Sequence, residues 1–424
     1  MSNNTRRTIE VWADWASLKG PTLMGTLSTT PSRGREIFSF EYDPEWLSGP
    51  HVQTLDPALS LFEGPQYAPA SQDNFGLFLD SCPDRWGRVL MRRREAQSAR
   101  EEKRRERTLM ESDYLLGVHD SHRMGAMRFR LSKDGPFLDD NEQFASPPWT
   151  SLSQLEQVCL QLEREDAAED PDYSKWLRML IAPGASLGGA RPKASVVDDG
   201  GVLWIAKFPS SSDDDDAGAW EGVAHALARS SGVQTAETRI RKFASHHHTF
   251  LTRRFDRTGD GRRLHFASAM TLLQRSDGED AGAGVSYLEL AELIIKSGSQ
   301  TNRDLEELWR RIVFFICISN TDDHLRNHGF LLDPSGWSLA PAYDMNPNPH
   351  GSGLRLNISE TDNAQDLELA LEVAPWFRVT PARAREIINR IIQVVARWQE
   401  VAQAHHIGMD KKERMASAFV HAHF

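Results

Sequence analysis

Cysteine is scarce in this chain of 424 residues, which contains only Cys82, Cys159 and Cys317. The three cysteines lie far apart and form no C-x-x-C pair, which argues against a disulfide framework or a zinc site and is typical of a reducing compartment. No apolar run approaches the ~18 residues that a membrane span needs, and the N-terminus lacks an apolar signal core. We therefore expect a cytoplasmic protein without a membrane partner.

Positive charge is also in deficit, because the formal net charge is −11. The whole molecule should therefore not bind nucleic acid through bulk electrostatics. Residues 84–107 are a local exception, with ten Lys or Arg against four Glu. They predict a basic helix, which is either a solvated helix with many ion pairs or an arm that contacts nucleic acid or an acidic partner.

The length predicts two or three domains. Residues 7–45 alternate apolar and polar side chains and predict strands, whereas residues 151–182 predict two helices. A Pro- and Asp-rich stretch at 133–149 separates these parts and suggests a domain boundary. From residue 286 onward the apolar spacing is mostly helical, with closing helices over 379–404 and 409–422.

A continuous apolar run at 312–318 is followed by the polar sequence Thr-Asp-Asp-His-Leu-Arg-Asn at 321–327. Asp322 and Asn327 are five positions apart, and Asp344 follows 17 residues later. Protein-kinase catalytic loops space a base Asp, a metal-binding Asn and a metal-binding Asp in this way, although neither H-R-D nor D-F-G is present. The spacing predicts Asp322 as the base that accepts the proton of the attacking hydroxyl, with Asn327 and Asp344 as magnesium ligands.

The two residues next to Asp322 have alternative roles. Asp323 could replace Asp322 as the base, but it is only four positions from Asn327 and fits the template less well. His324 could orient the loop, or it could be a structural histidine beside a core helix.

Residues 184–193 are small and glycine-rich, so their backbone N–H groups could approach a phosphate closely. A hairpin pattern over 194–208 follows and carries Lys207 in Trp-Ile-Ala-Lys-Phe-Pro, as a kinase small lobe presents a lysine to phosphates. Glu221 lies in the first turn of the next predicted helix. It either pairs with Lys207 or stabilises the helix dipole from an exposed position.

Three further patterns have structural interpretations. We interpret the acidic run at 213–216 as a solvated linker and the histidines at 246–248 as solvent-facing rather than metal-binding. The pattern Thr301-x-x-Asp304 predicts a capped helix start.

Five motifs together resemble the HipA-like serine/threonine kinases, which are toxins of type II toxin–antitoxin systems. The motifs are Ser186-x-Gly188-Gly189-x-x-x-Lys193, Ile205-Ala206-Lys207-Phe208-Pro209, Arg254-Phe255-Asp256-Arg257, Asn320-Thr321-Asp322-Asp323-His324-Leu325-Arg326-Asn327 and Tyr343-Asp344-Met345-Asn346-Pro347. They occur in the family's order, and the resemblance covers nearly the whole chain.

The resemblance implies an α+β fold, namely a two-lobed protein-kinase-like fold of HipA type with a small β-rich N-terminal subdomain and a mostly helical C-terminal lobe. The corresponding division is an N-terminal subdomain at 1–145, a small lobe with the glycine-rich loop at 146–260, and a helical lobe with the catalytic and metal-binding motifs at 261–424.

The resemblance also implies ATP and Mg²⁺ as cofactors. It assigns phosphate or nucleotide binding to the following residues: Ser186, Gly188, Gly189, Lys193, Lys207, Arg253 and Phe255. Members of the family can autophosphorylate the loop serine, which corresponds to Ser186, and the added charge switches the kinase off. Family members often carry Glu where this chain has Arg253, and that departure bears on nucleotide preference.

The implied partners are a helix-turn-helix antitoxin, operator DNA through the antitoxin complex, and a protein substrate such as glutamyl-tRNA synthetase or another translation factor. Two other classes of function stay open from the sequence. One is a non-catalytic regulatory subunit of an antitoxin–DNA complex, for which the basic helix at 84–107 is the best support. The other is a metal hydrolase that uses Asp322, Asp323, His324 and Asp344.

Overall fold

The computed structural model describes residues 6–138, 147–184 and 191–423, with the side chains of 182–184 left out of the description. The chain divides into two compact units. Unit 1 comprises 1–212, 243–245 and 256–267, and unit 2 comprises 213–242, 246–255 and 268–424. The three-part division expected from the sequence stays a prediction.

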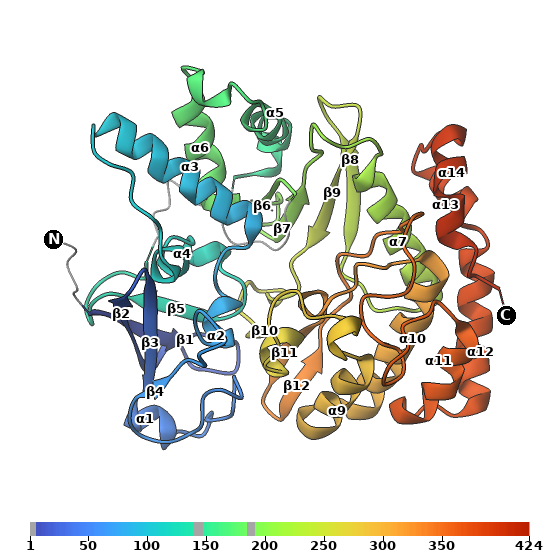
Figure 1. Cartoon of the computed structure of the whole chain (residues 1–424), viewed down its shortest axis with the longest axis horizontal. Helices are drawn as coiled ribbons and strands as arrows, with labels where there is room; N and C mark the ends of the chain where they lie inside the picture. The colour runs from blue at the N-terminus through green and yellow to red at the C-terminus, as the bar shows by residue number, and fades with distance from the viewer. Residues whose placement is uncertain (1–5, 139–146, 185–190, 424) are drawn as a thin grey trace. The chain divides into compact units, whose positions relative to one another are not determined.

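Unit 1 begins with an antiparallel sheet in the order β4-β3-β2-β1-β5 (Figure 1). Its strands are β1 (Arg7–Ala13), β2 (Thr22–Ser32), β3 (Arg35–Tyr42), β4 (Gln66–Tyr67) and β5 (Met127–Arg130). The predicted strands over 7–45 are confirmed, because Ile9, Val11 and Ala13 alternate into the core as the period-two pattern requires. Gly25 is needed in β2, since an added Cβ would lie 2.2 Å from the carbonyl oxygen of Glu41.

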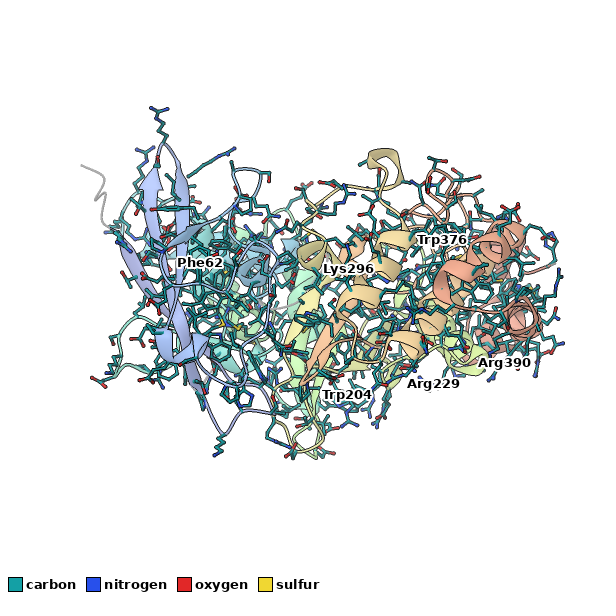
Figure 2. The ribbon with its side chains drawn as sticks, turned by 90° about the horizontal axis from the view of Figure 1, so that it is seen from below. Phe62, Trp204, Arg229, Lys296, Trp376 and Arg390 are labelled. Atoms are coloured by element: carbon teal, nitrogen blue, oxygen red, sulfur yellow. The ribbon has the colours of Figure 1, made fainter. Side chains whose placement is uncertain are left out.

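Four helices of unit 1 lie between strands of this sheet in the chain, two more follow β5, and a hairpin comes after them. The helices are α1 (Pro44–Leu47), α2 (Gly76–Leu79), α3 (Arg85–Glu101), α4 (Glu111–Leu116), α5 (Leu152–Leu162) and α6 (Tyr173–Gly184). The hairpin consists of β6 (Lys193–Val197) and β7 (Leu203–Lys207), where Trp204 is buried and donates through Nε1 to Oδ2 of Asp198 at 2.9 Å (Figure 2). Helix α3 packs against α6, as Figure 1 shows.

The basic helix predicted over 84–107 forms only as α3, which ends at Glu101, so the helical prediction is wrong for 102–107. Its side chains make many ion pairs: Arg88 contacts both carboxylate oxygens of Glu111 at 2.6 and 2.7 Å, and Arg104 and Arg107 contact Glu95. The interpretation as an ion-paired segment is therefore supported for Arg88 on the helix and for Arg104 and Arg107 after its end.

Unit 2 is mostly helical. Its helices are α7 (Ala217–Ser231), α8 (Ala269–Leu272), α9 (Tyr287–Ser297), α10 (Thr301–Ile318), α11 (Leu367–Val373), α12 (Pro381–Val395), α13 (Trp398–Ala404) and α14 (Met409–Met415). Two antiparallel hairpins complete the unit, β8 (Thr238–Lys242) with β9 (His248–Arg253) and β11 (Gly329–Asp333) with β12 (Gly336–Leu339). Helix α10 is the centre of the unit, since it packs against both α9 and α12 (Figure 1).

The end of α7 is closed by a neighbouring helix. Gly232 adopts φ +87°, a left-handed conformation that glycine adopts without penalty. The guanidinium of Arg390, on α12, donates to the carbonyl of Ser230 at 3.1 Å (Figure 2). A cation at this end of a helix is favourable because it complements the helix dipole.

The interpretation of 213–216 as a solvated linker is wrong for Asp216, and the solvent-facing interpretation is wrong for His248. Asp216 is 6% exposed and caps α7 by accepting a hydrogen bond from the N–H of Ala219. The same carboxylate accepts the backbone N–H of His248 at 2.9 Å, and its Oδ2 lies 2.6 Å from Nδ1 of that histidine. Composition could not reveal this, because the partner is 32 residues away in the sequence.

The predicted capping pattern at Thr301 is also wrong in detail. Helix α10 does begin at Thr301, but its N-cap is Gln300 and no side chain caps it. Asp304 is 1% exposed and accepts the backbone N–H of Leu339 instead, which ties α10 to β12.

Candidate functional site

The central motif of unit 2 lies where α10 ends. The apolar run 312–318 is buried because α10 is the core helix of the unit. Ser319 ends the helix in a left-handed conformation, with φ +49° and ψ +50°. The helix therefore ends directly before the polar residues 320–327, of which Asn320, Asp323 and Asn327 stay buried.

The two adjacent carboxylates of this motif have opposite environments. Asp322 is exposed, and its carboxylate has no hydrogen-bond partner among the described residues. Asp323 is 1% exposed, and its Oδ2 lies 2.7 Å from the hydroxyl of Tyr287 and 2.7 Å from Nε2 of His328. Burial, together with the charge of Asp323, raises the pKa of Tyr287 well above its ordinary value, so Tyr287 stays a hydrogen-bond donor. Asp323 anchors the loop, and Asp322 is left accessible to a substrate.

Asn327 is held next to Asp322. It lies in a 3₁₀ turn, Leu325–Asn327, is 8% exposed, and donates through Nδ2 to the backbone carbonyl of Asp322 at 3.1 Å. This bond uses the amide nitrogen and leaves Oδ1 as an acceptor for a cation. The five-residue spacing thus has a local geometric reason.

Asp344 lies on a second loop that is bonded to the first. It adopts φ +57°, which is uncommon for a residue other than glycine and is typical of constrained functional positions. Three side-chain hydrogen bonds join this second loop to the motif at 320–327. They run from the N–H of Asn346 to Oδ1 of Asn320 (2.9 Å), from Nδ2 of Asn348 to Oγ1 of Thr321 (2.8 Å), and from the hydroxyl of Tyr343 to the carbonyl of Arg326 (2.7 Å).

The donor set fits a hard cation. Carboxylate and amide oxygens, such as those of Asp344 and Asn327, are the ligands that Mg²⁺ prefers, together with water and phosphate. Among the described residues no group of three or more His, Cys, Asp and Glu side chains could hold a metal ion. Because Asp323 is committed to Tyr287 and His328, the four-residue hydrolase site is less well supported than a site of Asn327 and Asp344.

His324 is half-buried beside these residues, and its Nδ1 makes no hydrogen bond within the described part of the chain. Its role in orienting the loop stays a prediction.

The predicted phosphate-binding lysines belong to unit 1. Lys193 and Lys207 are directly opposite each other in the β6–β7 hairpin, and the N–H of Phe208 donates to the carbonyl of Pro192 at the same end. Directly opposite side chains share one face of a hairpin, and on this face Lys193 is buried at 4% exposed whereas Lys207 is half-buried. Ser186, Gly188 and Gly189 lie outside the described residues.

The remaining predicted residues lie in unit 2. Glu221 is 5% exposed on α7, so the exposed dipole-stabilising alternative is wrong, while its pairing with Lys207 stays a prediction. Arg253 ends β9 and donates its N–H to the carbonyl of Glu237 at 2.8 Å. The ring of Phe255 packs against Tyr343, with centroids 5.4 Å apart and planes tilted by 31°.

Sequence reasoning missed the residues that hold the two loops, notably Tyr287, Asn320 and Tyr343. Asn320 and Tyr343 begin two of the five motifs, and a polar side chain that directly precedes the acidic part of such a motif is a signal that could have identified them. Tyr287 is 36 residues from its partner Asp323, and the helical spacing from residue 286 onward does not indicate that pairing.

Comparison with known proteins identifies relatives of both the sequence and the fold. The sequence model of the HipA-like C-terminal domain matches residues 185–398, about half of the chain. A Haemophilus influenzae protein named "Putative kinase" is 31% identical over 101 residues, which cover 22% of this chain and 29% of that protein. This chain therefore matches less than a third of that relative's length.

A solved structure is similar over almost the full length. A chain in the complex of HipA, HipB and operator DNA from the Shewanella oneidensis MR-1 toxin–antitoxin system has a TM-score of 0.61 at 17% identity. The similarity covers 98% of this chain and 95% of that chain. The expected α+β fold of HipA type, with a β-rich N-terminal part and a mostly helical C-terminal region, is thereby confirmed.

Proposed function

The chain belongs to the HipA-like family, and on that premise we propose that it is an ATP-dependent protein serine/threonine kinase, the toxin of a type II toxin–antitoxin module. The observation that carries this proposal is the exposed Asp322 beside the buried Asp323, with the amide of Asn327 bonded to the carbonyl of Asp322. A kinase needs one accessible carboxylate and one adjacent oxygen ligand at this spacing.

The reaction would be the transfer of the γ-phosphoryl group of ATP to a hydroxyl group. Asp322 accepts the proton of the attacking hydroxyl, and the ADP leaving group departs in line with the attack. Asn327 and Asp344 hold magnesium, which, when bound, neutralises charge on the phosphates. Lys193 and Lys207 bind the phosphates, and the side-by-side register of these two lysines supports that role. Such catalysis consists mostly of positioning and charge stabilisation.

Further residues have proposed roles in nucleotide binding. The backbone amides of Gly188 and Gly189 contribute to phosphate binding, and Arg253 and Phe255 contact the nucleotide. Glu221, which is buried on α7, orients Lys207. Arg253 stands where family members often carry Glu, so the nucleotide preference of this chain can differ from theirs.

We further propose that Ser186 is the autophosphorylation site and that its phosphate switches the kinase off. The partners are a helix-turn-helix antitoxin, operator DNA through that antitoxin, and a protein substrate of translation such as glutamyl-tRNA synthetase. The Shewanella complex, which contains HipA, HipB and operator DNA, supports the first two partners by analogy.

We place the protein in the cytoplasm. The three cysteines Cys82, Cys159 and Cys317 are free thiols, which supports a reducing compartment. No helix in the described part of the chain has the length and apolar character needed to cross a membrane.

The second candidate is a non-catalytic subunit of an antitoxin–DNA complex. Its support is the group of basic residues on and after α3 that have no acidic partner in the described structure, namely Arg85, Arg92, Arg94, Arg100, Lys103 and Arg105.

One experiment separates the two candidates. Purified protein is incubated with Mg-ATP, and its intact mass and phosphopeptides are measured, with Asp322→Asn as the control. The kinase proposal expects one added phosphate on Ser186 that the control lacks. ATP binding without any phosphoryl transfer, to itself or to the purified antitoxin, would favour the regulatory subunit, and phosphate release without a phosphoprotein would favour a hydrolase.

A further inference from the structure

Unit 1 contains a cavity that none of the proposed kinase residues lines. Its volume is about 350 Å³, within the range of small-molecule sites. Residues of β1, α3, α4 and the segments at 107–109 and 131 form its walls. Figure 1 labels α3, α4 and β1, which all contribute residues to these walls.

One part of the cavity wall is apolar. Met91 projects from α3, Leu116 from the end of α4, and Leu109 from the segment between these helices. Leu131 completes this wall and is 53% exposed, Leu109 and Leu116 are half-buried, and Met91 is buried. The three leucines leave apolar surface in the cavity, which favours a ligand with an apolar part.

The other part of the wall is basic and largely fixed in position. Arg7 donates through Nη1 to Oγ of Ser112 at 3.0 Å and to Asp113 at 3.3 Å. Arg107 donates through Nη1 to Asp113 at 3.3 Å and through Nε to Glu95 at 3.5 Å. Each guanidinium has five N–H donors. Among the described residues, the Nη2 groups of Arg7 and Arg107 have no hydrogen-bond partner.

A third arginine gives the cavity its excess of positive charge. Arg94 lines the cavity, is exposed, and has no acidic partner within the described ranges. The lining residues Arg7, Arg94 and Arg107 carry three positive charges against two negative charges on Glu95 and Asp113, which leaves an excess of one. The hydrogen bond from Arg104 lowers the pKa of Glu95 to about 2, so that carboxylate stays charged and keeps its arginines in place.

We propose that this cavity binds a small amphiphilic monoanion, a molecule with an apolar chain or ring of moderate size and one carboxylate. The apolar part packs on Met91, Leu109, Leu116 and Leu131, and the carboxylate accepts hydrogen bonds from Arg94 and from the remaining donors of Arg7 and Arg107. Charge complementarity selects an anion over a neutral molecule, because the neutral molecule would leave the excess charge unpaired. The site would be separate from the kinase residues and does not depend on the proposed activity.

The test is isothermal titration calorimetry of the full chain with octanoate, with 1-octanol as the uncharged counterpart. Octanoate is expected to bind saturably at one site, and 1-octanol more weakly. Arg94→Gln is expected to weaken octanoate binding about tenfold, as the loss of a hydrogen bond to a charged group does. Arg92→Gln is the matched control, because Arg92 is an exposed arginine on the same helix that does not line the cavity.

A second variant tests the cavity itself. Ser98 lines the cavity from α3, so Ser98→Phe should fill part of it and weaken octanoate binding without removing a charge. Thermal unfolding of each variant checks that the fold is retained. The proposal is overturned if octanoate shows no saturable binding below its micelle concentration, if 1-octanol binds as tightly, or if Arg92→Gln weakens binding as much as Arg94→Gln.

Discussion

The Oδ2 atom of Asp323 lies 2.7 Å from Nε2 of His328, and both side chains are only 1% exposed. The preceding residue, Asp322, has an exposed carboxylate. The two adjacent aspartates therefore have different roles: Asp323 anchors the loop, and Asp322 is accessible.

Asp322→Asn should abolish phosphoryl transfer and leave the fold intact. The variant keeps the size of the side chain but cannot accept the substrate proton, and the loss of a general base typically costs a factor of about 10² to 10⁴. Radiolabelled phosphate transfer measures the activity, and thermal unfolding checks the fold. Turnover at the wild-type rate would show that Asp322 is not the base.

Asp323→Ala should lower stability far more than Asp322→Ala. It leaves the hydroxyl of Tyr287 and the ring of His328 buried without a partner, and each such loss costs about 1–3 kcal/mol. The exposed Asp322→Ala is the control and should stay within about 0.5 kcal/mol of wild type. Urea unfolding at pH 7 measures both, and equal free energies of unfolding for the two variants would contradict the anchor role.

We expect the protein to become less stable at low pH because Asp216 becomes protonated there. Burial opposes its ionisation, but the hydrogen bonds from the backbone and side chain of His248 outweigh burial and lower the pKa of Asp216 in the folded protein. The stability from this shift is fully present above the unfolded pKa and is lost as the pH falls through the lowered native pKa.

The check is urea unfolding of wild type and Asp216→Asn between pH 7 and pH 2.5. Asn is also a good N-cap residue, so the variant should keep α7. The difference in free energy of unfolding between wild type and Asp216→Asn should be largest at neutral pH. It should shrink as the pH falls below 3.8, the ordinary pKa of an aspartate. Parallel pH profiles for the two proteins would show that Asp216 is not the responsible group.

The sequence predicted those parts of the fold and site that depend on local pattern. The alternating strands near the N-terminus, the apolar stripe of α10 and the five-residue spacing of Asp322 and Asn327 are all short-range features. The sequence did not predict Asp216 with His248 or Asp323 with Tyr287, since these partners are 32 and 36 residues apart. A buried polar contact of that range depends on tertiary packing, which composition and periodicity do not encode. The preference for Asp322 over Asp323 rested on spacing, and their difference in burial now supports it.

The hydroxyl of Tyr343 should help to position both proposed magnesium ligands. It donates to the carbonyl of Arg326, next to Asn327, while Tyr343 itself precedes Asp344. Tyr343→Phe keeps the ring against Phe255 and removes the hydrogen bond to the carbonyl of Arg326, whose net contribution is about 1 kcal/mol. The Mg²⁺ concentration for half-maximal autophosphorylation should then rise about fivefold, which is the factor that corresponds to this free energy.

The measurement is a Mg²⁺ titration of autophosphorylation, with urea unfolding of the same variant. Tyr173→Phe, a hydroxyl deletion in α6 of unit 1, is the control and should leave the Mg²⁺ midpoint unchanged. A merely structural hydroxyl at Tyr343 would change the free energy of unfolding and leave the Mg²⁺ midpoint where it was. That result would mean that the bond between the two loops stabilises unit 2 without setting the distance between Asn327 and Asp344.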